Sequence, residues 1–466
     1  MKRIIFLGFS TVLTLLLFSC SKEKERIYEP VSKIETKAKE QARLDAMLAI
    51  ARSPQRASSE AFTIARSMLG DGGGTKTRGS AYEMDYILTE HTSKGVRSVD
   101  GNTSVDTALY IINKKNDGGF CIVSGDKRIP GLLAFSDNGH INKDSIDGAS
   151  ALAVFLSRLP AFSQMKVDKF QKELNNLQVQ YNRPEKPIDH FQYETIYTEW
   201  EEVYRKKEFV PVEWGQDSPY NDNAPVFDGK HAAAGCVTTA TAQILATHEY
   251  PKTFAGMTYD WSLLTSDLCQ DNQRPERARQ LAYLFRKIGD ALGNSWGVAS
   301  TSAKTSDVPK LLQQMGYKHP SQLTRYNRKG IIASLENNNP VLMRGNTERH
   351  VIKRYLFWIV IGEEVVYTGG HAWVCDGYVK RERSYITYDV DANEIADSGK
   401  EHEYYLHCNW GWGGMHNGYF FDGVFDAEHK STEVKETPKY EFQSTDGGNS
   451  SLYFQYNIEN ILDIHP

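Results

Sequence analysis

The sequence predicts a globular α+β protein of two or three domains. Its 466 residues are too many for one hydrophobic core. Hydrophobic residues make up 40% of the chain and aromatic residues 11%, which excludes a largely disordered protein. Segments with helical spacing and short apolar runs typical of strands occur in both halves. The net charge of -5, with both signs interspersed, excludes a basic surface for nucleic acid.

The N-terminus indicates export. An apolar run from Ile4 to Phe18 follows Lys2 and Arg3, and it is too short to span a bilayer as a resident helix. We therefore expect a signal peptide over residues 1–19. Residues 17–20, Leu-Phe-Ser-Cys, resemble a bacterial lipoprotein cleavage box, so we expect Cys20 to be lipidated and to anchor the protein in the outer membrane at the cell surface. The alternative is an ordinary secretory signal in which this cysteine is incidental.

A charged tether over residues 20–31 leads to a first predicted domain over residues 32–182. The composition of residues 34–51 and 149–180 predicts helices, the second broken into two pieces at Pro160. Between them we expect a hairpin whose strands are residues 107–112 and 119–124.

Residues 183–210 form a predicted linker before a second domain over residues 211–466. The linker begins with Arg-Pro-Glu-Lys-Pro and contains Arg205-Lys206-Lys207. Exposed, extended and charged segments are preferred sites of proteolysis, so we expect the chain to be cut here.

Cys236 is the most informative residue of the second domain. It follows the turn Ala234-Gly235 and begins a segment of helical spacing that should end before Pro251. A helix N-terminus stabilises a thiolate through its free N–H groups and its dipole. The alternative is that Cys236 is a small buried hydrophobic residue, as most single cysteines are.

A reactive cysteine needs a base, a group that orients the base, and donors for an oxyanion. His371 lies in a glycine-bounded apolar run, residues 369–377, that predicts a strand. The amide oxygen of Asn409 can accept from the imidazole N–H and fix its tautomer. Gln216 supplies a side-chain amide donor upstream of Cys236.

Two competing assignments exist for the histidines and cysteines near these motifs. His407 is the rival base, but on a strand it would be a neighbour of Asn409 rather than a partner across the site. Cys269, Cys375 and Cys408 lack the close pairing of zinc ligands, so we expect no structural metal. With Cys121, these cysteines should be mostly free and buried, and Cys375 with Cys408 is the one pair to check for a disulfide.

Several separated segments together resemble the streptopain-type cysteine peptidases, bacterial relatives of papain. They occur in the expected order over most of residues 210–425. The interval from Cys236 to His371 also falls within the roughly 130 to 150 residues expected of cathepsin-like enzymes. The matching segments are Trp214-Gly215-Gln216, Pro219-Tyr220-Asn221, Gly235-Cys236-Val237, Thr239–Ile244, Tyr250-Pro251, Asn339-Pro340-Val341, Gly369–Ala372 and Asn409–Gly414.

The resemblance implies Cys236 as nucleophile, His371 as general base and acid, and Asn409 as the orienting residue. Gln216 and the backbone N–H of Cys236 would form the oxyanion hole, and Trp410 would cover the His–Asn pair. The eukaryotic papain signature around the cysteine is absent, which favours the bacterial branch. The implied fold packs the helix of Cys236 on a mostly antiparallel sheet. The implied activity is endopeptidase cleavage of proteins and peptides, without metal or organic cofactor.

Residues 113–130 resemble the propeptide of the same family, which implies an inhibitory prodomain and a latent zymogen. The alternative for this half is an independent adhesion or binding module. For the whole chain, the alternatives are a catalytically idle cell-surface binding protein on the same fold and a Cys/His acyltransferase or amidase.

Overall fold

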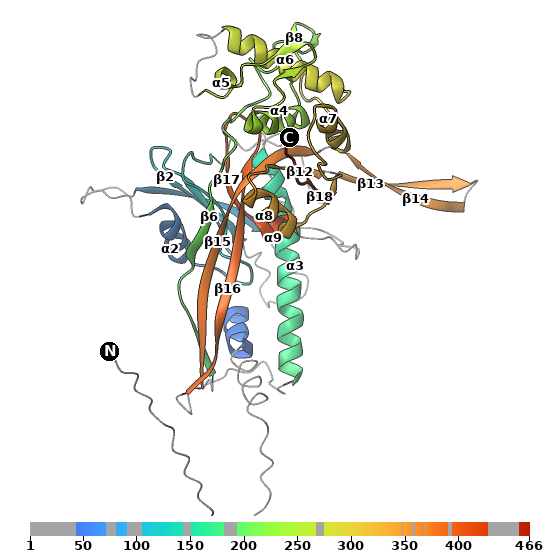
Figure 1. The fold of residues 1–466 in the computed structure, drawn as a ribbon. Helices are drawn as coiled ribbons and strands as arrows, with labels where there is room; N and C mark the ends of the chain where they lie inside the picture. Colours follow the sequence, from blue (N-terminus) through green and yellow to red (C-terminus); the bar gives the residue numbers. More distant parts are fainter. Residues whose placement is uncertain are drawn as a thin grey trace, which may run out of the picture.

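The computed structural model describes eleven segments of the chain, and the architecture below refers to them alone. They combine helices with antiparallel sheet, which confirms the α+β class (Figure 1). The described residues are 43–70, 81–90, 105–142, 151–180, 193–266, 275–346, 348–356, 359–368, 370–389, 394–426 and 456–466.

The N-terminal half contains three helices and four strands among its described residues. The first helix covers residues 43–52 and packs against the far end of α3 through Leu44, Leu48 and Leu177. The other elements are α2 (Ser58–Leu69), β1 (Tyr82–Glu90), β2 (Val105–Lys114), β3 (Phe120–Ser124), β4 (Leu132–Ser136) and α3 (Ala151–Gln180).

The predicted hairpin of this half is confirmed, because β2 and β3 pair in antiparallel register with Asn113 opposite Phe120. The predicted break at Pro160 is wrong, since α3 continues through it. A proline inside a helix costs roughly 3 kcal/mol. Phe155 and Phe162, on either side of it, are both fully buried against the C-terminal half, and this packing keeps the two parts of α3 in line.

The C-terminal half contains most of the strands. Its elements are β5 (Tyr193–Tyr197), β6 (Glu201–Lys206), β7 (Val226–Phe227), β8 (Lys230–His231), α4 (Cys236–His248), β9 (Thr253–Phe254), β10 (Met257–Thr258), α5 (Trp261–Leu264), α6 (Pro275–Ala291), α7 (Val308–Gln314), β11 (Thr324–Arg325), α8 (Arg328–Glu336), β12 (Val341–Asn346), β13 (Glu348–Leu356), β14 (Ile359–Thr368), β15 (His371–Asp389), β16 (Glu394–Asn409), β17 (Gly418–Phe421), α9 (Asp422–Phe425) and β18 (Tyr456–Ile461).

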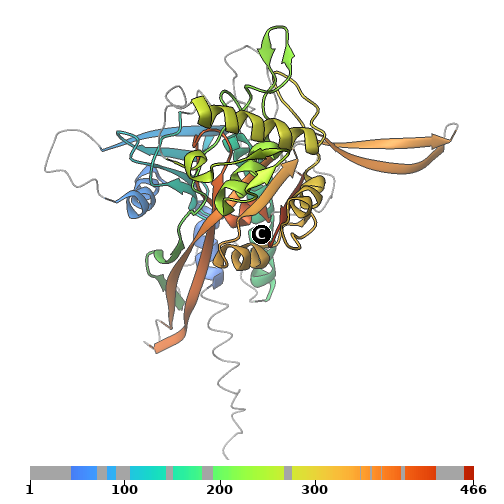
Figure 2. The same ribbon diagram turned by 45° about the horizontal axis from the view of Figure 1, so that its top comes forward.

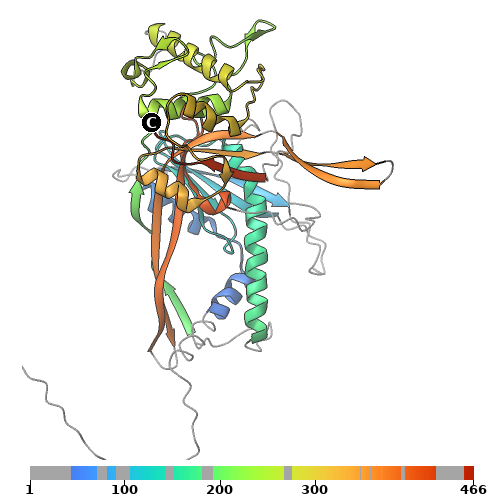
Figure 3. The same ribbon diagram turned by 45° about the vertical axis from the view of Figure 1, so that its right-hand side comes forward.

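One twelve-stranded sheet runs through both halves of the molecule. Its main order is β1-β2-β3-β4-β17-β16-β15-β12-β18-β11, and every described pairing in it is antiparallel. The junction is the pairing of β4 with β17, where Phe135 lies opposite Tyr419. The hairpin β13–β14 projects to one side, while α3 and the hairpin β15–β16 extend away from α4 (Figures 1 and 3).

Part of the predicted linker, residues 183–210, belongs to this sheet. Strand β6 pairs with β15 from Tyr378 to Glu382, and β5 pairs with it from Tyr385 to Asp389. Residues 181–192 lie outside the described part of the chain.

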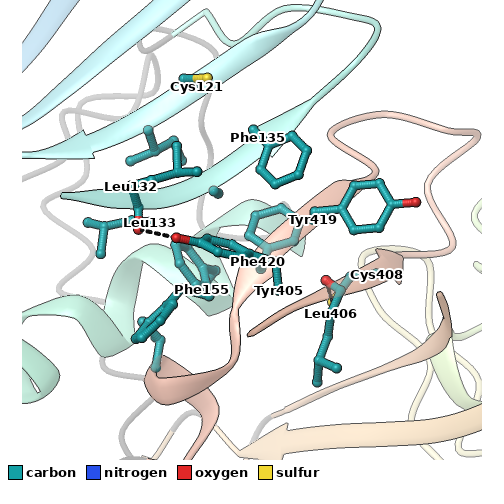
Figure 4. Packing of buried hydrophobic residues seen from close by; sticks show 14 of the residues in the cluster. Cys121, Leu132, Leu133, Phe135, Phe155, Tyr405, Leu406, Cys408, Tyr419 and Phe420 are labelled. Carbon is teal, nitrogen blue, oxygen red and sulfur yellow. Dashed lines mark hydrogen bonds between the residues drawn. The ribbon is translucent and has the colours of Figure 1, made fainter. Parts of the chain in front are cut away.

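Aromatic side chains fill the junction between the two halves (Figure 4). Phe135 stacks on Tyr419 with ring centroids 5.1 Å apart, and Phe155 packs at 4.9 Å from Phe420. The hydroxyl of Tyr405 donates to the Leu132 carbonyl oxygen across 3.2 Å. Such buried aromatic pairs add about 0.5–1.5 kcal/mol each beyond the area they remove from water.

A second hydrophobic core lies between the sheet and the helices α4, α6 and α7 of the C-terminal half. Helix α4 packs against β12 and β15 on one side and against α6 on the other (Figure 2). The predicted helix after Gly235 is therefore confirmed, and it ends at His248, before Pro251. None of the described helices combines the length and the apolar character needed to cross a membrane.

Candidate active site

Cys236 is the first residue of α4. Gly235 before it has a φ of 91°, and an added Cβ would lie 3.1 Å from Thr301, so glycine suits this turn on both counts. Burial raises the pKa of the Cys236 thiol, while the backbone N–H groups of Ala372, Val237 and Cys236 itself oppose this by favouring the thiolate. The contact with Ala372 places the thiol beside the residue that follows His371.

His371 is the first residue of β15 and pairs with Gly345 of β12. Its ring is buried, and Nε2 lies 2.8 Å from the Trp410 carbonyl oxygen. Because a carbonyl only accepts, the neutral ring carries its proton on Nε2 and leaves Nδ1 as the basic nitrogen. Burial lowers the pKa of His371 to about 4, although the bond to the Trp410 carbonyl acts in the opposite direction.

Thiol and imidazole are therefore both neutral at neutral pH in this form of the protein. In the part of the chain that the structure describes, no hydrogen bond joins the Cys236 thiol to the His371 ring. The two residues are neighbours without yet forming a thiolate–imidazolium pair.

Gln216 is close to the nucleophile in space. Its backbone carbonyl accepts a hydrogen bond from the Ala234 N–H at 2.9 Å, two residues before Cys236. The hydroxyl of Thr239, on α4, donates to the Gly215 carbonyl at 3.3 Å. The segment that carries Gln216 is thus fixed to the turn before Cys236 and to the helix after it.

Among the described residues, the hydrogen bonds of the Asn409 side chain go to groups other than the imidazole. Its Nδ2 donates to the Val212 carbonyl at 2.8 Å, and its Oδ1 accepts from Gln243 Nε2 at 3.0 Å. The backbone carbonyl of the next residue, Trp410, takes the place beside the ring. Asn409 ends β16 opposite Val374, so its side chain leads away from His371.

The Trp410 ring lies beside the His371 ring, with the ring centroids 6.4 Å apart and the planes tilted by 40°. It is fully buried and packs 5.0 Å from Trp373 and 5.1 Å from Phe420. The rings that lie nearly parallel to His371 are those of Trp373, at 6.3 Å, and Trp412, at 6.1 Å. Three tryptophan rings therefore surround the imidazole, and Trp410 also supplies the carbonyl that bonds to it.

Glycines shape the loop between β16 and β17 that carries this carbonyl. Gly411, Gly413 and Gly414 all have positive φ, and a Cβ on Gly414 would lie 2.4 Å from Glu213. The side chain of Asn417 accepts from the Trp410 N–H at 3.0 Å and closes the loop. The glycine-rich motif after Asn409 therefore serves to turn the chain tightly beside His371.

The rival base His407 is engaged elsewhere. Its Nδ1 lies 2.6 Å from Asp376 Oδ1, and both side chains are buried. The other oxygen of Asp376 accepts from the Val210 N–H. His407 thus belongs to a buried ion pair that fastens residue 210 to the sheet.

The other cysteines of the described residues lie inside strands of the sheet. Cys121, Cys375 and Cys408 are buried and free, and Cys375 lies directly opposite Cys408 in the pairing of β15 with β16. Cys269 and Cys20 lie outside the described residues. The described residues contain no group of three side chains suited to hold a metal ion.

Gln243 was missed by the sequence reasoning. It is a fully buried polar residue of α4, and it connects Asn409 with the Trp214 carbonyl. The signal was present, since one large amide stands among the small and apolar residues of Ala240–Ala246.

Comparison with protein families gives two matches. Residues 214–420 match the Peptidase C10 family, and residues 29–160 match the Spi protease inhibitor family. The chain is similar to streptopain of Streptococcus pyogenes, with 26% identity over 67% of this chain and 73% of that protein. It is also similar to the thiol protease/hemagglutinin PrtT of Porphyromonas gingivalis, with 22% identity over 68% of this chain and 34% of that protein.

Among solved structures, similarity extends to a fragment of prointerpain A from Prevotella intermedia. It has 19% identity and a TM-score of 0.45 and covers 82% of this chain and 99% of that one. Active interpain A from the same organism has 20% identity and a TM-score of 0.36 and covers 57% and 97%.

The site and the family matches agree on the class of protein. A cysteine at a helix N-terminus beside a buried histidine lies within the segment that matches the peptidase family, and the inhibitor family matches the segment before it. The chain is therefore a cysteine peptidase that carries a Peptidase C10 family domain over residues 214–420, preceded by a Spi-type inhibitor domain over residues 29–160.

Proposed function

We propose that this chain is the latent precursor of an exported, lipid-anchored cysteine endopeptidase with Cys236 as nucleophile and His371 as general base and acid. Nδ1 of His371 takes the thiol proton, and the sulfur attacks a peptide carbonyl carbon. The resulting imidazolium then protonates the leaving amine, which leaves a thioester on Cys236. Water, deprotonated by the same nitrogen, hydrolyses the thioester and restores the thiol.

The observation that carries this proposal is the hydrogen bond from His371 Nε2 to the Trp410 carbonyl. It sets the tautomer in which Nδ1 is free to receive a proton. In other catalytic triads a carboxylate or amide side chain has this orienting function. The orienting partner we propose is thus Trp410, and Asn409 acts only through the position of that carbonyl.

Gln216 and the backbone N–H of Cys236 are proposed as the oxyanion donors. Both belong to segments joined by the bond between Ala234 and Gln216, so their relative position is fixed before substrate binds. Donors held in place in this way stabilise the charge that develops on the carbonyl oxygen, and losing one costs about 10² to 10³ in kcat.

We further propose that residues 32–182 inhibit the peptidase by pairing with β17, the strand that follows the catalytic loop. Strand β17, which follows the loop of Trp410, pairs with β4 of this domain. The buried guanidinium of Arg158 donates to the Val424 carbonyl at 3.0 Å, at the end of α9. Arg205 pairs with Asp137 and lies over the rings of Phe135 and Tyr419. Release of the inhibitor domain would free the strand next to the catalytic loop.

Cleavage within residues 183–210 is proposed as the activating step. Strands β5 and β6 and the connection between them are hydrogen-bonded to β15, so we expect the cut to fall outside residues 193–206. Export through residues 1–19 and lipidation of Cys20 complete the proposal. Metabolic labelling with a radioactive fatty acid should mark the wild type and leave Cys20→Ala unmarked, and label on the variant would contradict the anchor.

Maturation tests the central proposal. On incubation, the wild-type precursor should shorten to one product whose N-terminal sequence begins within residues 183–210, whereas Cys236→Ala should stay intact. The matured wild type should hydrolyse casein and lose this activity with an epoxide inhibitor of cysteine proteases. Correct folding and secretion without any hydrolysis would instead favour the idle binding protein.

A matched pair of variants tests latency. Arg158→Met removes the bonds to the end of α9, while Arg128→Met removes a more exposed arginine of the same domain that pairs with Asp126 of that domain. We expect faster maturation of the first and an unchanged rate for the second. Equal rates would contradict inhibition through this contact.

A further inference from the structure

Gln243 occupies an unusual place on the nucleophile's helix. It lies two turns after Cys236 on α4 and is fully buried. Its Nε2 donates two hydrogen bonds, one to the Trp214 carbonyl at 3.2 Å and one to Asn409 Oδ1 at 3.0 Å. A single amide group thus connects α4 to two segments that are distant in sequence.

Each of these acceptors belongs to a part of the proposed catalytic centre. Trp214 lies two residues before Gln216, the proposed oxyanion donor. Asn409 precedes Trp410, whose carbonyl receives the hydrogen bond from His371. The Gly411 N–H also donates to Asn409 Oδ1, at 3.4 Å, so the Asn409 side chain holds the peptide unit whose carbonyl oxygen faces His371.

The Asn409 side chain closes the arrangement. Its Nδ2 donates to the Val212 carbonyl at 2.8 Å, and the chain then continues to Trp214. Gln243 and Asn409 therefore fasten the segment 212–214 to the end of β16 at two points. The orientation of both amides is determined, because each nitrogen faces carbonyl or amide oxygens that can only accept.

The amide is retained at an energetic cost. Gln243 Oε1 is buried and has no hydrogen-bond partner among the described residues. A buried acceptor without a partner costs about 1–3 kcal/mol, which an apolar side chain of similar size would avoid. The free energy of folding therefore does not by itself explain a glutamine at this position. The two hydrogen bonds that its amide donates to segments of the catalytic centre do explain it.

We propose that Gln243 is a positioning residue of the peptidase that sets the Trp410 carbonyl, and through it the His371 ring, relative to Cys236 and the segment of Gln216. This inference rests on the proposed function of Cys236 and His371. Groups that hold a functional side chain through a second residue typically affect activity by about 10- to 100-fold.

Gln243→Met is the test variant, since methionine has a similar length but no donor. Thr241→Val is its control, because Thr241 is equally buried on α4 and its side chain bonds to the Val237 carbonyl of its own helix. Gln243→Glu is a second, isosteric variant in case methionine prevents folding. All are made in the full chain and matured with the same unrelated serine protease, which is then inhibited.

Two readings separate positioning from stability. Gln243→Met should lower kcat by about 10- to 100-fold with KM within about 3-fold of wild type, while Thr241→Val keeps kcat within about 3-fold. In the uncleaved chain, the Nε2–H proton resonance of His371 should shift in Gln243→Met and stay in place in Thr241→Val. Gln243→Glu should change both readings in the same direction as Gln243→Met.

Wild-type kcat in folded Gln243→Met, or an unmoved His371 resonance, would overturn the inference. Failure of the proposed function is distinguishable from this, because wild type would then show no hydrolysis dependent on Cys236. In that case the resonance of His371 still decides whether Gln243 sets the position of the ring.

Discussion

His371 and His407 lie on neighbouring strands of one sheet, and their rings bond to partners of different charge. Both residues are buried to the same degree, each 8% exposed. The ring of His371 bonds to a neutral backbone carbonyl, whereas the ring of His407 bonds to the carboxylate of Asp376. Burial is thus held constant while the charge of the partner changes.

The pKa values of the two rings respond in opposite directions. Burial lowers the pKa of His371 to about 4, and the carbonyl bond only partly compensates. Burial also disfavours the charged form of His407, but the negative charge of Asp376 and its hydrogen bond outweigh this and raise the pKa of that ring. A buried histidine beside a dipole loses its proton more readily, whereas one beside a carboxylate keeps its proton to higher pH. The first arrangement suits proton transfer, and the second suits structure.

The largest expected effect is on activity. Cys236→Ala should leave less than about a thousandth of wild-type hydrolysis, and His371→Ala should be nearly as damaging. His407→Ala should reduce the activity of the folded enzyme far less, because its ring is committed to Asp376. Peptide hydrolysis per mole of folded enzyme measures all three, and a reversed order of the two histidines would refute the assignment of the base.

The next largest effect is on stability. Asp376→Asn should destabilise the protein by about 3–5 kcal/mol at pH 6, because it leaves the buried His407 cation without its partner. The raised native pKa means that this stabilisation is complete below pH of about 6.5 and is lost as the pH rises through that pKa. Denaturant unfolding at several pH values should therefore show the two proteins converging at alkaline pH. A difference that grows with pH would contradict the ion pair.

His371 should give the opposite pH dependence. Its lowered pKa means that the unfolded chain binds a proton more readily than the native one between pH of about 6.5 and 4. Stability of the precursor should fall across this interval as the pH decreases, and His371→Gln should remove that component of the slope. An unchanged acid slope in the variant would show that the ring is not held neutral.

A smaller effect is expected for Asn409→Ala. The side chain holds Val212 and Gln243 rather than the imidazole, so its loss should lower kcat by about 10- to 100-fold through displacement of the Trp410 carbonyl. Steady-state kinetics on a peptide substrate would measure this. A loss as large as that of His371→Ala would indicate direct contact with the ring during catalysis.

The smallest effect concerns substrate choice. We expect an apolar side chain to be preferred two residues before the scissile bond, since the residues next to Cys236 and His371 are uncharged. A hydrophobic pocket discriminates by only about 1–3 kcal/mol per methylene, so many proteins should be cleaved. A peptide library would measure the preference, and a dominant demand for arginine, lysine or aspartate would contradict it.

Local signals in the sequence predicted the elements that present the site. The glycine turn before Cys236, the spacing after it and Pro251 defined α4, and the glycine-bounded run at His371 defined the start of β15. Their association with a sheet followed from the family resemblance. These features depend on neighbours in the chain, which a sequence displays directly.

The contacts that were wrong or missed depend on three-dimensional packing. Whether His371 meets the Asn409 side chain or the Trp410 carbonyl depends on one turn of a glycine-rich loop. Pro160 stays inside α3 because of aromatic partners far away in sequence, and β6 belongs to the sheet because β15 continues beyond β12. A glutamine among apolar helix residues suggests that its amide donates hydrogen bonds inside the protein. The sequence does not show that the acceptors are the Trp214 carbonyl and the Asn409 side chain.

Covalent labelling tests the central claim most directly. An epoxide inhibitor of cysteine proteases, incubated with the matured wild type, should add one equivalent of mass to a peptide containing Cys236. His407→Ala should be labelled at a rate close to wild type, and His371→Ala at least about 100-fold more slowly. Labelling of another cysteine, or rapid labelling that survives His371→Ala and is lost in His407→Ala, would contradict the account.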